Sequence, residues 1–432
     1  MDCKVNGSLF NFKVIFVIFV SLIFLAVFST KAHAGENNCF DIEMPITPEE
    51  QRIDEGAPIP QNILEDSNFQ RYVDEFIEDL CSAPNLENAE NKIKKNGTQL
   101  FENAVKQAQG QGADPKLDRY DDRPLYWARL HMVRALRQWT PSFSLSEDER
   151  DGLIKELEYT SRGITSVDFP NGNGVKRILV SGFDPFQLQN EFRRSNPSGA
   201  SALQLDGLKV NTANGPAHIQ AVILPVRWQD FDDGMVEDAF APFLAKDAKG
   251  RLDMLMTISQ GRARQMDIEE FAGRWQSGVD NEMASRLGVV PPVDHWPMPS
   301  ELPEFIETTL PYEEMINANT GPWKVQLNKQ ICEVLPPEFT NRTCHTNGPT
   351  PGAEARSGGG GAYLSNESQY RSNRVRLGLG ADDVAGGHLH IASLEFYPKD
   401  KSVYIDPAFQ NHRTVTVDQT VELVKAAAHA LK

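Results

Sequence analysis

Apolar positions follow a helical period in the first part of the chain. The clearest face, recurring every three to four positions, consists of Phe69, Tyr72, Val73, Phe76, Ile77 and Leu80. A second helix is predicted to begin at Asp122 with Pro in its first turn, and a third opens at Ser146 with a Ser-x-x-Glu capping box. These patterns predict a small all-α domain over 67–168, preceded by an extended arm, rich in Pro, Asp and Glu, over 35–66.

The pattern changes after the turn-rich segment 169–175, which we interpret as a linker. From there short apolar segments of the strand type alternate with helical ones, and a closing helix is predicted to begin at Asp418. The expected strands are 177–180, 219–226, 253–258 and 388–396. This alternation favours an α/β domain with a mostly parallel sheet over 176–432. Ligands of such sheets bind beyond the carboxyl ends of the strands.

The N-terminus has the pattern of a secretory signal peptide. Lysines precede an apolar run over 14–28, and the small residues Ala32 and Ala34 stand at an A-x-A cleavage site. We therefore expect residues 1–34 to be removed and the protein to be exported, to the periplasm or the medium, without stable membrane insertion. An uncleaved membrane anchor is the alternative interpretation, although the run is short for a spanning helix.

Charge and cysteine content narrow the possible partners. The chain of 432 residues has a formal net charge of −17, which disfavours nucleic acid and anionic membranes. Cys39, Cys81, Cys332 and Cys344 lie beyond the leader, and this even number is typical of two disulfides in an exported protein. Three pairings are possible, and sequence neighbourhood favours Cys39 with Cys81 and Cys332 with Cys344. A metal site at Cys332, Cys344 and His345 lacks a CxxC spacing, so we expect neither metal nor cofactor.

A run of four glycines at 358–361 precedes Ser365 and a helix-like segment. Glycine lets the backbone turn sharply and lie close to a ligand. A hydroxyl at the start of the following helix would lie among free backbone N–H groups, which acyl-transfer enzymes use to hold an oxyanion. The alternative is an ordinary mobile loop.

Two other segments carry candidate pocket and acid residues. Phe183 and Phe186 flank Asp-Pro directly after the first expected strand, where they could line an apolar pocket or simply pack in the core. The alternating segment 266–272 would aim Glu269 or Glu270 towards the strand ends, although acidic pairs are usually solvated.

The late strand carries two histidines. His388 and His390 are two residues apart, so they share one face of a strand and could together bind a metal. A third ligand is not evident in the sequence. One of them acting as a buried base is the simpler hypothesis, and a structural histidine is the alternative.

In their order and spacing these features resemble the pyroglutamyl peptidase I (pyrrolidone-carboxylate peptidase) family of cysteine peptidases. The resemblance extends from about residue 175 to the C-terminus and excludes the helical domain. The matching motifs are Ile-Leu-Val-Ser-Gly-Phe-Asp-Pro-Phe at 178–186, Asn-Pro-Ser at 196–198, Met-Asp-Ile-Glu-Glu-Phe-Ala at 266–272, Asp-Asn at 280–281, Gly-Gly-Ala-Tyr-Leu-Ser-Asn-Glu-Ser-Gln-Tyr at 360–370 and His-Leu-His-Ile-Ala at 388–392.

The resemblance implies a fold and a set of residue roles. The fold would be a three-layer sandwich of the phosphorylase/hydrolase-like kind. Ser365 stands where the family has its nucleophilic cysteine, with His390 as the base and Glu269, or alternatively Glu270, orienting the imidazole. The implied substrate contacts are Phe183, Phe186, Asn196 and Gly361.

Departures from the family pattern leave three functions open. Gln187 and Leu188 replace a Gly-Gly pair, and 276–279 replaces Asp-Ala-Arg, so the pocket loops differ. The first hypothesis is an exported peptidase that cleaves an N-terminal pyroglutamyl or related amide through an acyl-serine, its partner being a peptide or small amide substrate. The second is an inactive pseudoenzyme that binds a peptide or lactam. The third is a serine esterase or amidase of altered specificity.

Overall fold

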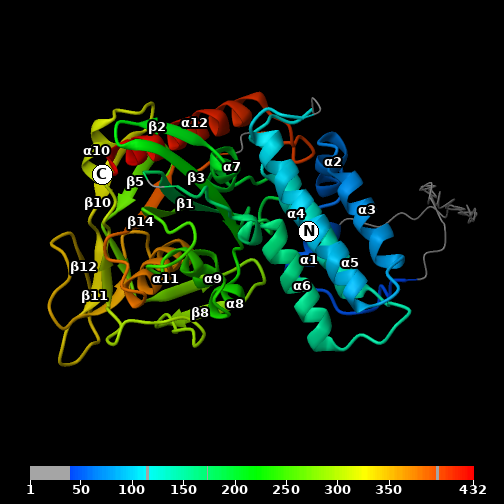
Figure 1. Cartoon of the computed structure of the whole chain (residues 1–432), viewed down its shortest axis with the longest axis horizontal. Coiled ribbons are helices and arrows are strands. Elements are labelled where there is room, and N and C mark those ends of the chain that lie inside the picture. The colour runs from blue at the N-terminus through cyan, green and yellow to red at the C-terminus, as the bar shows by residue number, and fades with distance from the viewer. Residues whose placement is uncertain (1–38, 113–115, 173, 396–397) are drawn as a thin grey trace, which may run out of the picture. The chain divides into compact units, whose positions relative to one another are not determined.

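Within the described residues, six α-helices precede the first strand of the sheet, and local capping residues start three of them (Figure 1). A capping box of Thr47 and Glu50 starts the first, Asn85 caps the fourth, and Ser146 with Glu149 forms the predicted box of the sixth. The computed structural model describes residues 39–112, 116–172, 174–395 and 398–432. The six helices are α1 (Pro48–Glu55), α2 (Ile59–Asp66), α3 (Gln70–Cys81), α4 (Leu86–Ala108), α5 (Arg123–Gln138) and α6 (Glu147–Ser161). The helical prediction is confirmed, whereas the extended arm over 35–66 is wrong because α1 and α2 lie within it.

A seven-stranded sheet forms the second part. Its order is β10 (Lys324–Asn328), β5 (Gln265–Glu269), β14 (Ala385–Ile391), β4 (Met254–Gln260), β1 (Lys176–Phe183), β3 (Gly215–Leu224) and β2 (Lys209–Thr212). The pairs β1–β3, β1–β4, β4–β14 and β5–β10 are parallel, while β5–β14 and β2–β3 are antiparallel. The predicted α/β class with a mostly parallel sheet is confirmed.

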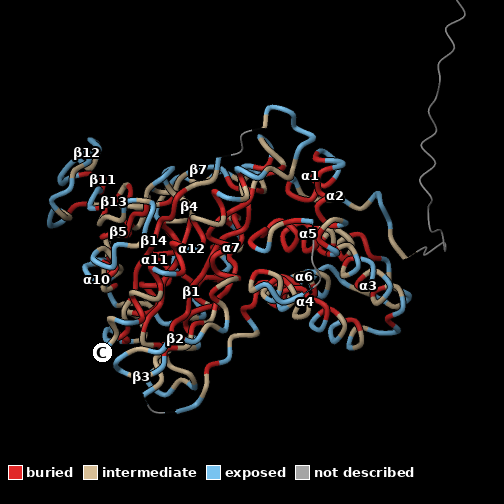
Figure 2. Tube along the Cα trace, turned by 90° about the horizontal axis from the view of Figure 1, so that it is seen from above, coloured by how far each residue is buried: buried red, intermediate tan, exposed pale blue. Residues whose placement is uncertain are grey.

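Helices cover both faces of this sheet. They are α7 (Pro197–Leu205), α8 (Trp228–Asp232), α9 (Met235–Phe240), α10 (Tyr312–Asn317), α11 (Leu364–Gly378) and α12 (Pro407–Ala430). On β1, Ile178 and Val180 join a core with α7, α12 and the N-terminal helices, whereas Leu179 and Phe183 join a second core with α8, α9 and α11. The alternation of strand side chains therefore creates three layers. Figure 2 shows continuous burial along the central strands β1 and β4 and along α7.

Smaller sheets extend from the strand ends. They are β6 (Phe271–Gly273) with β9 (Phe305–Glu307), β7 (Gln276–Val279) with β8 (Ser285–Gly288), and β11 (Ile331–Val334) with β12 (Arg342–His345) and β13 (Glu354–Ser357). The closing helix begins at Pro407 with Asp406 as its cap, so the expected start at Asp418 is wrong. Asp418 lies inside α12, where it accepts a hydrogen bond from the Tyr120 hydroxyl (2.8 Å).

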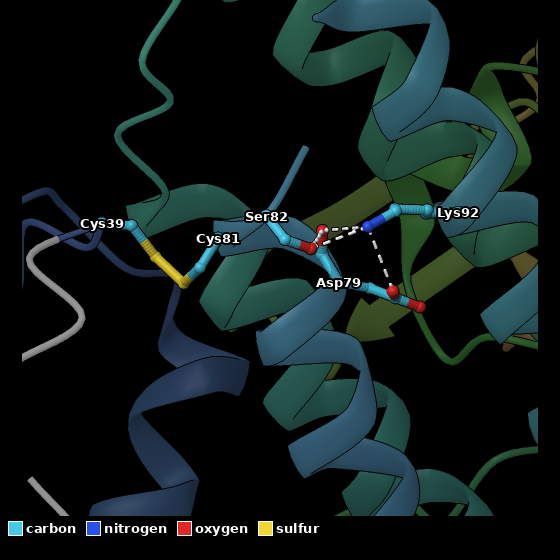
Figure 3. Close-up of a disulfide and its surroundings, with 5 residues drawn as sticks. All are labelled: Cys39, Asp79, Cys81, Ser82 and Lys92. Carbon is cyan, nitrogen blue, oxygen red and sulfur yellow. Dashed lines mark hydrogen bonds and ion pairs between the residues drawn. A yellow bond between two sulfur atoms is a disulfide. The ribbon is translucent and has the colours of Figure 1, made fainter. Parts of the chain in front are cut away.

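Both favoured disulfides are present. Cys39 is bonded to Cys81, and beside this bridge Lys92 contacts Asp79 at the end of α3 (Figure 3). Cys332 is bonded to Cys344 across β11 and β12, which removes the alternative of a metal site there. The predicted leader lies outside the described residues. Within the described ranges, no helix is both long and apolar enough to cross a membrane.

Candidate active site

The centre of the site is a contact between His390 on β14 and Glu269 at the end of β5. These strands are neighbours in the sheet, and the imidazole Nδ1 lies 2.7 Å from Glu269 Oε1. Because a carboxylate accepts, Nδ1 donates, and this tautomer leaves Nε2 as a proton acceptor. The second carboxylate oxygen of Glu269 accepts a hydrogen bond from Asn328 Nδ2 at 2.8 Å. Both residues of the pair are buried, and the Glu269 carboxylate is held between the imidazole and the Asn328 side chain.

Glu270 does not take part in this contact. Its carboxylate binds Lys329 Nζ at 2.9 Å on the other side of the extended chain. Successive side chains of an extended segment point in opposite directions, and this geometry separates the two glutamates. Of the two candidate acids in the sequence, the structure brings only Glu269 to the histidine.

His388 occupies a different environment from His390. Its two ring nitrogens bind the hydroxyl groups of Thr257 (2.7 Å) and Ser259 (2.8 Å) on β4. Burial, and then the neighbouring His390, hold the pKa of His388 well below its ordinary value, so this ring is neutral. The two imidazoles contact edge to face, with centroids 4.6 Å apart. Among the described residues, no cluster of three or more His, Cys, Asp or Glu side chains could hold a metal ion.

Ser365 is the second residue of α11. The first intrahelical hydrogen bond runs from the Glu367 N–H to the Tyr363 carbonyl, so the N–H groups of Ser365 and Asn366 precede the helical ladder. The Asn366 side chain fixes this end by bonding both backbone groups of Gly273 (2.8 Å each). The Ser365 hydroxyl donates to the Gly360 carbonyl (3.2 Å) and not to His390.

The glycine run makes a tight turn against the Glu269–His390 pair. Gly358 and Gly361 exchange backbone hydrogen bonds, and Gly361 has a φ of 82°. A Cβ on Gly359 would lie 2.1 Å from Glu269 Oε2, and one on Gly360 would lie 3.0 Å from His390 Cε1. Only glycine allows this approach. Gly360 therefore contacts both the imidazole and, through its carbonyl, the Ser365 hydroxyl.

Ser365 opens onto a small pocket of about 40 Å³. Its lining consists of Phe183, Phe186, Asn196, Val226, Ser259, Gln260, Tyr363, Leu364 and Ser365. Three of the four expected substrate contacts are therefore at the pocket wall. The fourth, Gly361, is exposed in the glycine turn and does not line the pocket.

Asn196 lines the pocket but also holds the loop. Its side-chain nitrogen donates to the Asp184 carbonyl (2.8 Å), and its oxygen accepts from Ser198 N–H as the cap of α7. Asn196 therefore has a structural role in addition to its expected contact with substrate.

A larger cavity of about 770 Å³ lies elsewhere, lined by residues of α5, α6 and the segments 227–235 and 280–286. Its charged groups pair with one another: Arg137 with Glu50, and Arg227 with Glu158. Ser365 lines the smaller pocket, and Gly360, whose carbonyl accepts from its hydroxyl, packs against the His390 imidazole, so we take this end of the sheet as the chemical centre.

Sequence reasoning missed Asn328 and Tyr363. Asn328 reaches Glu269 only because β10 pairs with β5, and no motif marks that pairing. Tyr363 lies within the glycine-serine motif, two positions before the serine, so its place in the pocket could have been anticipated. Its hydroxyl donates to the Val279 carbonyl (2.9 Å), which fixes the ring against the pocket.

Two solved structures are similar to part of this chain. The crystal structure of Pyroglutamyl Peptidase I from Bacillus amyloliquefaciens is 18% identical and covers 59% of this chain and 96% of that chain, with a TM-score of 0.38. The crystal structure of Pf-PCP(1-204)-C is 16% identical and covers 58% and 95%, also with a TM-score of 0.38.

The sequence is similar to a second group over most of its length. Residues 30–158 match the model of the PA0049 N-terminal domain, and residues 177–287 with 324–395 match that of the PA0049 C-terminal domain. The chain is 28% identical to Uncharacterized protein PA0049 of Pseudomonas aeruginosa, covering 92% of this chain and 89% of that protein. The C-terminal match includes Glu269, Ser365 and His390.

Proposed function

We propose that this chain is an exported hydrolase that cleaves an N-terminal pyroglutamyl amide, or a related amide, through an acyl-Ser365 intermediate. The observation that carries the proposal is the 2.7 Å contact between His390 Nδ1 and Glu269, against which the glycine turn before Ser365 packs. This arrangement supplies an oriented base beside a hydroxyl at a helix start. The two disulfides are consistent with export.

In the first half of the reaction, the Ser365 hydroxyl turns from the Gly360 carbonyl towards His390. Its oxygen attacks the substrate carbonyl as its proton passes to the imidazole Nε2. Glu269 stabilises the imidazolium, and the N–H groups of Ser365 and Asn366 donate hydrogen bonds to the developing oxyanion. The C–N bond then breaks, and the leaving amine takes the proton from His390.

In the second half, a water molecule gives a proton to the imidazole and attacks the acyl-serine. Collapse of that intermediate returns the proton to the Ser365 oxygen and releases the acid. A serine can replace a thiolate here because the base removes its proton only during attack. In an oxidising compartment a low-pKa thiolate would be exposed to oxidation, which a serine avoids.

A pseudoenzyme is the second candidate, and one observation favours it. The Ser365 hydroxyl bonds to Gly360 and not to the imidazole, which is the arrangement expected of a binding pocket without turnover. Apo enzymes also show loose catalytic hydrogen bonds, so we retain hydrolysis as the conclusion. A serine esterase or amidase of altered specificity is the third candidate, and hydrolysis of an ester or of another amide in place of the pyroglutamyl amide would identify it.

The decisive experiment measures hydrolysis of a fluorogenic pyroglutamyl amide. Wild type is compared with Ser365→Ala, Ser365→Cys and His390→Ala, with Ser372→Ala as a matched control two turns along α11. We expect wild type and the control to be active and resistant to iodoacetamide, and Ser365→Ala and His390→Ala to lose at least about 10³-fold. An inert wild type together with an active Ser365→Cys would overturn the serine mechanism.

A further inference from the structure

Asp184 stands between Phe183 and Phe186 in the pocket wall, yet its carboxylate points away towards the N-terminal helices. Arg129 Nη1 donates to both of its oxygens (2.8 and 3.0 Å), and Arg162 Nη1 donates to one of them (2.6 Å). All three side chains are buried. Burial alone would raise the pKa of the Asp184 carboxyl, but the two guanidinium groups outweigh it and hold that pKa below its ordinary value.

The two arginines are themselves held in place. Arg129 on α5 donates to the Ser161 hydroxyl (3.0 Å), and Arg162, at the C-terminal cap of α6, donates to Glu158 (2.6 Å). Both guanidinium groups are therefore held by the C-terminal end of α6, through Ser161 and Glu158, before they reach Asp184. A guanidinium is planar and its N–H groups donate in fixed directions, as the prongs of a fork do. These contacts therefore fix the orientation of the Asp184 carboxylate as well as balancing its charge.

Two further contacts reach the same wall from the helical region. Asp122, just before α5, accepts hydrogen bonds from the Asn196 N–H (2.9 Å) and the Ser195 hydroxyl. Glu49 on α1 accepts from Asn281 Nδ2 (2.8 Å), which also donates to the Pro185 carbonyl (3.0 Å).

Stability alone does not account for these charges. A buried ion pair contributes little net stability compared with apolar packing of the same volume, because both charges must leave water. What it provides is a defined orientation. The segment 184–196 lies between β1 and α7, outside any helix or strand, so its conformation depends on such contacts.

We propose that the N-terminal helical region is an integral part of the substrate site, with Arg129 and Arg162 as positioning residues. Through Asp184 they hold Phe183 and Phe186 at the pocket beside Ser365. The inference rests on the proposed function for the identity of the ligand, but the contact between the helices and the wall stands on the geometry alone. The helices then contribute to substrate binding by positioning the pocket wall and not by contacting the substrate themselves.

The test uses the full chain with Arg129→Lys and Arg162→Lys. Each variant keeps the positive charge and removes the fork. The matched control is Arg374→Lys, because Arg374 is also buried and bonds the Glu237 carboxylate and the Pro291 carbonyl, neither of which lines the pocket or belongs to 183–198. Melting temperature, KM and kcat for the pyroglutamyl amide, and hydrogen exchange of residues 183–198 are measured for each.

We expect all three variants to lower the melting temperature. Only Arg129→Lys and Arg162→Lys should raise KM, by about tenfold, with kcat changed less than about threefold, and speed exchange in 183–198. The proposal is overturned if the control moves KM and exchange as much as they do. If wild type hydrolyses no pyroglutamyl amide, the proposed function fails, while the exchange of 183–198 still decides whether the arginines hold the wall.

Discussion

Glu269 and Glu270 are adjacent in sequence but differ in every contact that matters for chemistry. The first bonds His390 and Asn328 inside the site, and the second bonds Lys329. The neighbours in the fold supply the physical reason for the difference, because β14 brings the imidazole to the face of the chain that carries Glu269.

Glu269→Gln should therefore lower kcat/KM for the pyroglutamyl amide by about 10³-fold or more. The amide keeps the volume but removes the charge that orients and stabilises the imidazolium. Steady-state kinetics check this, with Glu270→Gln as the neighbouring control, expected within about threefold of wild type. Equal losses in the two variants would mean that the acid has been assigned wrongly.

At the scale of elements, the turn before α11 joins the sheet to Ser365. Its glycines let the turn lie against Glu269 and His390, and Asn366 ties the start of α11 to Gly273. The helix start and the glycine run are thus one unit. A mobile loop would tolerate side chains at these positions, whereas this turn requires glycine where it contacts Glu269 and His390.

Gly359→Ala should reduce activity by at least about 100-fold, because its Cβ would lie 2.1 Å from Glu269 Oε2 and displace the carboxylate. The control is Gly152→Ala in α6, where no neighbouring atom lies within 4 Å of the new methyl group. We expect that change to leave activity intact and to stabilise by about 0.5–1 kcal/mol. Kinetics and thermal melts measure both effects, and full activity of Gly359→Ala would contradict the packed turn.

At the scale of the whole molecule, the helices and the sheet share one hydrophobic core and a set of buried charges. The core that includes Val133 of α5 also includes Ile178 of β1. The carboxylate of Asp122 lies at this junction, where it accepts from the Asn196 N–H (2.9 Å). The junction is therefore sensitive to the protonation of buried groups.

Asp122 predicts a dependence of stability on pH. Burial, and then the nearby Asp121, raise the pKa of its carboxyl to about 7. The folded state then binds a proton that the unfolded state has lost, so this group's contribution is complete below about pH 4 and is lost as pH rises through 7. Between pH 4 and pH 8 this titration should lower the free energy of unfolding of the wild type by up to about 4 kcal/mol. Asp122→Asn has no carboxyl at this position and should not show that decrease.

Denaturant unfolding at pH 4, 6 and 8 measures this difference between wild type and variant. The exposed Asp247→Asn serves as the control and should track wild type at every pH. A constant offset between Asp122→Asn and wild type across the range would show that the carboxyl titrates normally.

The sequence by itself determined much of the framework. Helical periodicity and capping residues predict α3, α5 and α6, and strand-type runs predict β1, β3, β4 and β14, because these signals act over a few residues. Sequence neighbourhood also favoured both disulfides. The helices within 35–66 were not predicted, because charge and proline content obscured their short apolar faces, and the start of α12 was expected at Asp418 instead of Pro407.

Only the tertiary structure decided how the candidate residues meet. The contact of Asn328 with Glu269 depends on the pairing of β10 with β5, and the contact of Arg129 with Asp184 joins residues 55 positions apart. Neither has a local signature, because hydrogen bonds between distant segments follow from strand order and packing. The sequence supplied the serine, the histidine and the glutamate, and the fold determined which nitrogen meets which carboxylate and what holds the wall around them.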